Sequence, residues 1–229
     1  MNRSGMNRSE AEDLLRTIAP QVLGTLLRRY GTEQFDLCED AVQEALLEAY
    51  HSWTSSGPPS SPQGWLVTAA RRRMIDRIRS DARRREREVN DARLMHPLAD
   101  LAPIEQDDSL QVLMLCCHPC LTRSARVALT LRTVAGLSTA QIARGYLLPE
   151  ATIAQRISRA KAKIATSGAR FPEPAGADAG ERLDSVLTVL YLMFNEAHTA
   201  TSGSDLYDVD LAAEAIRLAR QVQDRKSVV

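Results

Sequence analysis

Five polar side chains within residues 150–164 have the types and spacing of a surface that reads DNA. Gln, Ser and Arg can hydrogen-bond to base edges, and Arg and Lys can neutralise phosphates. They lie off an apolar stripe of Ile153, Ile157, Ala160 and Ile164, whose steps of four, three and four place the stripe on one face of a helix. The pattern predicts an amphipathic helix with one face in a core. The candidate DNA-facing residues are Gln155, Arg156, Ser158, Arg159 and Lys163.

A shorter helix is expected just before this one. Ser138 and Gln141 have the spacing of a capping box, so a helix can begin there and run to about Arg144, where we expect Gly145 to break it. Pro149 suits the first turn of the following helix. The two elements have the spacing of a helix-turn-helix, which indicates DNA binding. A solvated amphipathic helix in an ordinary bundle is the alternative.

Charge is concentrated in two neighbouring segments, although the formal net charge of the chain is zero. Residues 71–87 contain nine arginines and three acidic residues, whereas residues 33–48 contain six acidic residues and no Lys or Arg. Such local patches, rather than a global field, would have to attract partners. The acidic segment predicts a surface that binds a basic protein, and the basic segment predicts a surface that binds a polyanion. The alternative for the acidic segment is an exposed helix with no partner.

The composition favours an all-α protein. Hydrophobic residues make up 44% of the 229 residues but aromatic residues only 4%, and helix formers outnumber β-branched residues. No run of eighteen apolar residues is present, and the first ten residues lack the apolar core of a signal peptide. We therefore expect no membrane span and a cytoplasmic location.

Three helices are expected in an N-terminal domain, residues 1–89. They cover residues 10–30, residues 36 or 37 to 53, and residues 65–85, with residues 55–64 as a loop because that segment is rich in Pro and Gly. The third helix should turn Trp65, Leu66, Ala69, Ile75 and Ile78 inward. In the second helix the outward-facing residues are expected to be Glu39, Asp40, Gln43, Glu44 and Glu48.

The rest of the chain divides into further helical units. Residues 90–108, polar and acidic with two prolines, are expected to form a flexible linker to a second domain at 109–167, with helices at 109–117 and 122–135 before the helix-turn-helix. A second linker is expected at 168–180. Residues 181–222 of a C-terminal segment, 181–229, should form two antiparallel helices. Their first helix should turn one face inward, made of Leu183, Val186, Leu187, Leu190, Tyr191 and Phe194.

Four potential soft metal ligands cluster at Cys116, Cys117, His118 and Cys120. A structural zinc site usually takes ligand pairs from two segments, and no second pair is present. We therefore favour buried thiols at the end of a core helix, with a redox-sensitive cluster or a metal site as alternatives, and expect no metal and no cofactor.

Enzymatic and stand-alone regulatory functions are less well supported. The chain has no GxGxxG, Walker, HExxH or GxSxG motif and its four histidines are scattered, so we identify no catalytic residue. A one-component repressor would also carry a helix-turn-helix, but it would not need an acidic helix beside a second basic one.

The order of these motifs resembles a bacterial sigma factor of the extracytoplasmic-function group, in the sigma-70 family. The matching segments are DLCEDAVQEALLEAY (36–50), PQGWLVTAARRRMIDRIR (62–79), LTRSARVALTLRTVAGLSTAQIA (121–143) and the basic helix 150–164. Beyond them, RLDSVLTVLYLMFNEAH and LAAEAIRLAR are similar to the subgroup with a C-terminal tetratricopeptide-like extension. The resemblance covers residues 10–165 and extends into the C-terminal segment.

The resemblance implies roles for individual residues. Asp40, Gln43 and Glu44 would bind the clamp helices of the largest subunit of core RNA polymerase. Residues of the 150–164 helix would read the −35 element, with Gln155, Ser158 and Arg159 facing bases and Arg156, Lys161 and Lys163 on phosphates. Residues 181–222 would start a regulatory extension acting within the chain or through a protein regulator. The −10 element would be bound by Arg71, Arg72, Arg73, Arg77 and Arg79.

Overall fold

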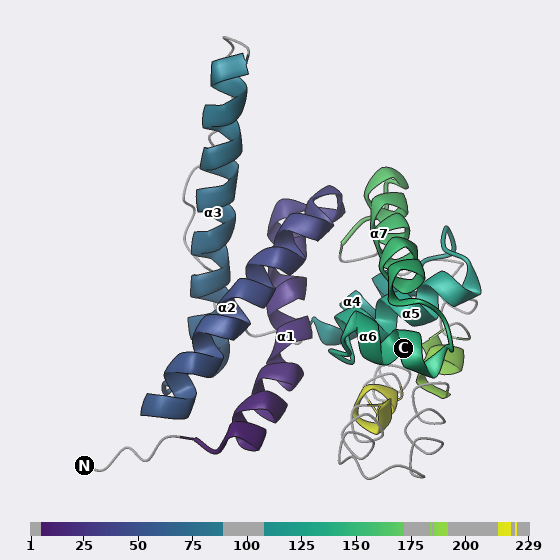
Figure 1. Ribbon diagram of the computed structural model, residues 1–229, viewed down its shortest axis with the longest axis horizontal. Helices are drawn as coiled ribbons and strands as arrows, with labels where there is room; N and C mark the ends of the chain where they lie inside the picture. Colours follow the sequence, from purple (N-terminus) through teal and green to yellow (C-terminus); the bar gives the residue numbers. More distant parts are fainter. Residues whose placement is uncertain are drawn as a thin grey trace.

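The computed structural model describes residues 6–88, 108–171, 184, 186–191, 215–220 and 223, with the side chains of residues 81–88 left aside (Figure 1). The described parts are helical and contain no strand, which confirms the predicted all-α class. The elements are α1 (Arg8–Tyr30), a 3₁₀ turn η1 (Thr32–Gln34), α2 (Phe35–Ser56), α3 (Pro62–Glu88), α4 (Ser109–Cys116), α5 (Arg123–Thr133), α6 (Thr139–Gly145) and α7 (Glu150–Thr166).

Local capping chemistry fixes where the first helix begins and ends. Asn7 caps α1 and forms a capping box with Glu10, so the helix starts two residues before the expected position. Gly31 ends it at a φ of 87°, a conformation that favours glycine. Leu14, Ile18, Val22 and Leu26 follow one another at steps of four; the last three are buried and Leu14 is partly buried.

The loop between α2 and α3 is shorter than we predicted. Residues 55 and 56 belong to α2, and α3 begins at Pro62, so only residues 57–61 lie outside both helices. Proline is compatible with the first helical turn, where its missing N–H is not needed, so the expectation of a loop through residue 64 was wrong. Gly57 ends α2 with a φ of 75°.

Helices α1, α2 and α3 pack around one apolar core. The rings of Trp53 and Trp65 meet edge to face with centroids 5.7 Å apart, and Trp53 is fully buried. On α3 the buried residues include Leu66, Ala70 and Met74, whereas Trp65, Ala69, Ile75 and Ile78 are only partly buried. The predicted inward face of α3 was therefore rotated by about one residue from the observed one, since only Leu66 is fully buried.

Helices α4–α7 form the second unit. Thr122 caps α5, and Ser138 and Gln141 form the predicted capping box at α6. Helix α6 ends at Gly145, within one residue of the expected end at about Arg144. The turn that follows contains Leu147, which has a φ of 52° and is 92% exposed. Pro149 then caps α7.

The two units contact each other. Helix α4 packs against α1, and α7 packs against η1 and α2, so the buried apolar residues of both units form one continuous core. The predicted linker 90–108 lies outside the described residues except for Asp108, which is buried and paired with Arg28 of α1. The predicted domain boundaries and the linker at 168–180 stay predictions.

In the C-terminal segment, the described residues are helical. Val186, Val189, Leu190, Ala215 and Leu218 are buried, which agrees with an inward apolar face. Leu187 and Tyr191 are exposed, so their predicted inward position was wrong. Leu183 and Phe194 lie outside the described residues, and the antiparallel pairing stays a prediction.

Candidate nucleic-acid and protein interfaces

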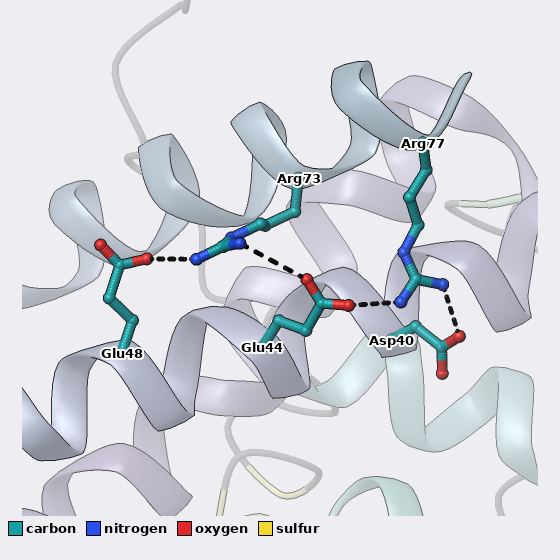
Figure 2. Close-up of polar contacts among 5 residues, drawn as sticks. All are labelled: Asp40, Glu44, Glu48, Arg73 and Arg77. Carbon is teal, nitrogen blue, oxygen red and sulfur yellow. Dashed lines mark hydrogen bonds and ion pairs between the residues drawn. The ribbon is translucent and has the colours of Figure 1, made fainter. Parts of the chain in front are cut away.

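An ion-pair ladder joins the acidic face of α2 to the arginine face of α3 (Figure 2). Arg73 Nη2 lies 3.0 Å from Glu48 Oε2, and its Nη1 lies 3.8 Å from Glu44 Oε2. Arg77 Nη1 donates to Asp40 Oδ2 at 2.8 Å, and its Nη2 donates to Glu44. We call these five residues the α2–α3 ladder. Glu44 bridges both arginines, and the reversed order of partners shows that the helices run antiparallel.

The ladder combines residues that we predicted for two different surfaces. Asp40 and Glu44 were assigned to polymerase, and Arg73 and Arg77 to the −10 element. Hydrogen bonding to Glu44 raises the pKa of Arg77 further. Because the side chains are between 37% and 51% exposed, such pairs contribute at most about 1 kcal/mol each and can exchange for other partners. The matched four-residue spacings of the acids and the arginines could have predicted this pairing.

The other predicted −10 residues lie on α3 outside the ladder. Arg72 and Arg79 are seven positions apart and exposed, whereas Arg71 is half-buried. Two turns of helix separate residues seven apart, so Arg72 and Arg79 share a face that a polyanion can reach. Gln43, the third predicted polymerase residue, is half-buried and borders a groove of about 610 Å³ between α1, α2 and α5.

Helix α7 has the predicted amphipathic division. The stripe Ile153, Ile157, Ala160 and Ile164 is buried. Four of the five candidate DNA-facing residues, Gln155, Ser158, Arg159 and Lys163, are exposed. Arg156 is half-buried, with its guanidinium carbon 5.9 Å from the centre of the Tyr146 ring at the end of α6. Helix α6, capped by Ser138, and helix α7 together have the form of a helix-turn-helix, and α7 presents an exposed polar face.

Lys161 of α7 faces the first unit instead of the exposed polar face. Its Nζ lies 3.1 Å from Asp36 Oδ1 and also pairs with Glu39, and its side chain is only 13% exposed. Burial alone would lower the pKa of Lys161, but the two carboxylates outweigh it and the pKa is raised. The predicted outward position of Glu39 was wrong, because Glu39 is buried against α5 and α7.

The cysteines are free thiols and mostly buried. Cys38, Cys116 and Cys117 are buried and Cys120 is partly buried, as expected for the end of a core helix. Burial raises the pKa of Cys38 and of Cys117 to about 12, so these thiols stay protonated at neutral pH. Within the described ranges, no group of three or more His, Cys, Asp or Glu residues could hold a metal ion.

None of the described helices has both the length and the apolar character to cross a membrane.

Sigma-70 region 2 matches residues 14–84, which contain α2 and most of α3, and Sigma-70, region 4 matches residues 111–164, which contain α5–α6 and most of α7. Residues 14–84 are therefore similar to sigma-70 region 2 and residues 111–164 to sigma-70 region 4, and we call these two parts of the chain region 2 and region 4. A family of unknown function (DUF6596) matches residues 182–228.

One similar protein is an uncharacterized protein of Rhizobium meliloti strain 1021. It is 40% identical over 210 residues, which cover 88% of this chain and 49% of the relative. The chain thus spans about half the length of that relative. No solved structure matches the chain.

Proposed function

We propose that this protein is a sigma factor of the extracytoplasmic-function type, which binds core RNA polymerase and directs transcription initiation at particular promoters. One observation carries the proposal: a single chain with both sigma-70 regions presents an acidic α2, an arginine-bearing α3 and a helix-turn-helix with an exposed polar face. No catalytic residue is assigned, and the protein is proposed to act in the cytoplasm, where the polymerase is.

In region 4, α7 is proposed to bind the −35 element in the major groove. Gln155, Ser158 and Arg159 are exposed on adjacent turns and have side chains that bond base edges. Arg156 and Lys163 are proposed to contact phosphates and so to position the helix without reading sequence.

In region 2, α3 is proposed to bind the −10 element. Opening a duplex needs cations along the separated strand. Arg72 and Arg79 are exposed, and Arg71 is half-buried. Arg73 and Arg77 are proposed to exchange their exposed carboxylate partners for phosphates when DNA arrives, which is feasible because surface ion pairs are weak.

Core polymerase is proposed to bind α2 through Asp40 and Glu44 of the ladder and through Gln43, which borders the neighbouring groove. A rigid helix that carries carboxylates one turn apart can bind arginines of a partner helix with defined geometry. Because Glu44 and Asp40 hold Arg77 in the free protein, polymerase binding and release of Arg77 for DNA would be coupled.

Residues 181–222 are proposed to belong to a tetratricopeptide-like regulatory element. The motif similarity supports this, as does the burial of Val186, Val189, Leu190, Ala215 and Leu218. Leu218→Asp should disrupt the packing of this segment and change promoter activity. If proteolysis shows that the segment of this variant is no longer packed and transcription is unchanged, the regulatory role is contradicted.

The function is tested by size-exclusion chromatography of the protein with bacterial core RNA polymerase. We expect co-elution, and we expect the Asp40→Lys/Glu44→Lys variant to remain unbound. That variant also breaks the ladder, so Glu48→Gln, which removes a ladder pair outside the proposed contact, serves as the matched control and should still co-elute. Wild-type protein that stays free while a known sigma factor binds the same core would contradict the proposal.

A further inference from the structure

The exposed side of α7 changes in character along the helix. Residues 150–155 contain no Lys or Arg, and their one charged residue is acidic. The cations proposed to contact DNA follow only after them, at Arg156, Arg159 and Lys163. The exposed residues of the first turns are Glu150, Ala151, Thr152, Ala154 and Gln155. These turns therefore offer DNA a small, uncharged surface beside one carboxylate.

The N-terminus of α7 is poorly suited to a phosphate. A helix N-terminus attracts anions through its N–H groups and its dipole. In α7 the first turn already contains an anionic group, the carboxylate of Glu150. In a helix-turn-helix, the N-terminal residues of the second helix contact base edges in the major groove. The first turns of α7 should therefore face bases, and its later turns supply the phosphate contacts.

Three of these exposed residues form one patch on the helix surface. Ala151 and Ala154 are three positions apart, and Ala151 and Gln155 are four apart, so their side chains are neighbours. Gln155 lies two residues from each of the buried Ile153 and Ile157. At about 100° per residue, it points away from the core. We call Ala151, Ala154 and Gln155 the α7 tip patch.

The chemistry of the α7 tip patch matches one kind of base pair. In the major groove, the amide of glutamine can bond to both N6 and N7 of adenine, and the methyl group of alanine packs against the methyl group of thymine. A G·C pair has no methyl group and suits arginine instead. The short side chains at Ala151 and Ala154 also let the helix backbone come close to the base edges. An A·T pair satisfies both the amide and the methyl groups.

We infer that the α7 tip patch reads an A·T base pair in the −35 element. The amide of Gln155 bonds to the adenine, and Ala151 and Ala154 pack against the methyl group of a thymine at that pair or the next one. The inference rests on the proposed function, because it requires α7 in the major groove. It assigns to the first turns of α7 a base class that differs from the guanine suited to Arg159.

The test begins with the full chain bound to core RNA polymerase, which selects its −35 sequence from a pool of random duplexes. Each thymine of the selected −35 sequence is then replaced singly by uracil, which keeps every hydrogen bond of thymine and lacks its methyl group. At one position the affinity should fall about fourfold, which corresponds to about 0.8 kcal/mol for one buried methylene. Unchanged affinity at every position would overturn the methyl contact.

Variants of α7 assign this loss to the α7 tip patch. In Ala151→Gly/Ala154→Gly, thymine and uracil should bind equally well. Ala162→Gly is the matched control, because Ala162 is exposed on the same helix and lies about 12 Å beyond Ala154. The control should keep the fourfold loss, and circular dichroism compares the helix content of both. A fourfold loss that persists in the double variant would overturn the role of the alanines.

A second exchange tests the amide. Replacing the A·T pair by G·C should weaken wild-type binding about fivefold or more. The same replacement should change the binding of Gln155→Ala less than twofold. Equal losses for both proteins would overturn the adenine contact.

Failure of the inference and failure of the proposed function give different results. A polymerase complex that selects a sequence but is insensitive to uracil and to the G·C exchange contradicts the inference alone. A chain that neither binds core polymerase nor selects any sequence contradicts the proposed function, and the inference with it.

Discussion

Helix α2 makes ion pairs on two faces, and their burial differs. The α2–α3 ladder has side chains that are 37–51% exposed, and it lies within region 2. The ion pair between Glu39 of α2 and Lys161 of α7, whose side chains are 7% and 13% exposed, joins region 2 to region 4. Exposed pairs are weak and exchangeable, whereas a buried pair is costly to break by removing one partner. The difference indicates that the ladder aligns α2 with α3 and can exchange its groups with partners, whereas the Glu39–Lys161 pair holds α7 against α2.

The largest expected effect comes from removing the buried carboxylate. Glu39→Gln should reduce the free energy of unfolding by about 3 kcal/mol, because Lys161 keeps only Asp36 as an anionic partner. Urea unfolding followed by circular dichroism would measure the change. If Glu39→Gln reduces the free energy of unfolding no more than Glu48→Gln in the ladder does, the buried pair is not stronger than the exposed pairs.

The same pair should respond to alkaline pH. The pKa of Lys161 is raised in the folded protein. The contribution of the charged Lys161 to the free energy of unfolding is therefore fully present below its pKa in the unfolded chain, near 10.5, and it is lost as the pH rises through its pKa in the folded protein. The difference in unfolding free energy between wild type and Glu39→Gln should be constant from pH 6 to about 10 and shrink as the pH rises further. Chemical unfolding of both proteins across this range would check it; a difference that grows with pH contradicts the assignment.

A smaller effect, on DNA binding, is expected for the exposed residues of α7, which do not share the contact of Lys161 with α2. Arg159→Ala should weaken binding to the preferred −35 sequence by roughly 1–3 kcal/mol, whereas Lys163→Ala should weaken all sequences alike and reduce the salt slope by about 1. Competition binding with specific and scrambled duplexes separates the two. Equal losses on both duplexes for Arg159→Ala would refute a base contact.

The smallest effect is expected in the ladder. Glu48→Gln should change the free energy of unfolding by less than about 1 kcal/mol, and moderate salt should remove even that difference, since the pair with Arg73 is half-exposed. Thermal unfolding at low and high salt measures both quantities. A large, salt-insensitive loss would mean that the ladder holds the fold.

The features that were predicted correctly depend on residues that lie close together in the chain. The capping box at Ser138 and the buried stripe of α7 were both found from spacing alone, because caps and helical periodicity are local. Helix positions were also predicted well, although Pro62 was assigned to a loop and in fact begins α3.

The predictions failed where long-range packing decides the environment. Glu39 is acidic and neighbours other acids, so it was expected to face solvent, yet region 4 covers it and supplies Lys161. The same reasoning missed the close packing at Gly24 of α1, where a Cβ would overlap the Cβ of Asp108, because nothing nearby in the sequence indicates that α4 approaches this position. The α2–α3 ladder was within reach, since Asp40, Glu44 and Glu48 repeat at the spacing of Arg73 and Arg77.

The most direct test of the account is a titration of core RNA polymerase into the protein labelled with a fluorescent dye at Thr166, which is exposed at the end of α7. If the protein is a sigma factor, the fluorescence anisotropy of the dye should rise in a saturable manner as polymerase binds, and excess unlabelled protein should reverse the rise. Unchanged anisotropy, while a known sigma factor binds the same core, would contradict the proposed function.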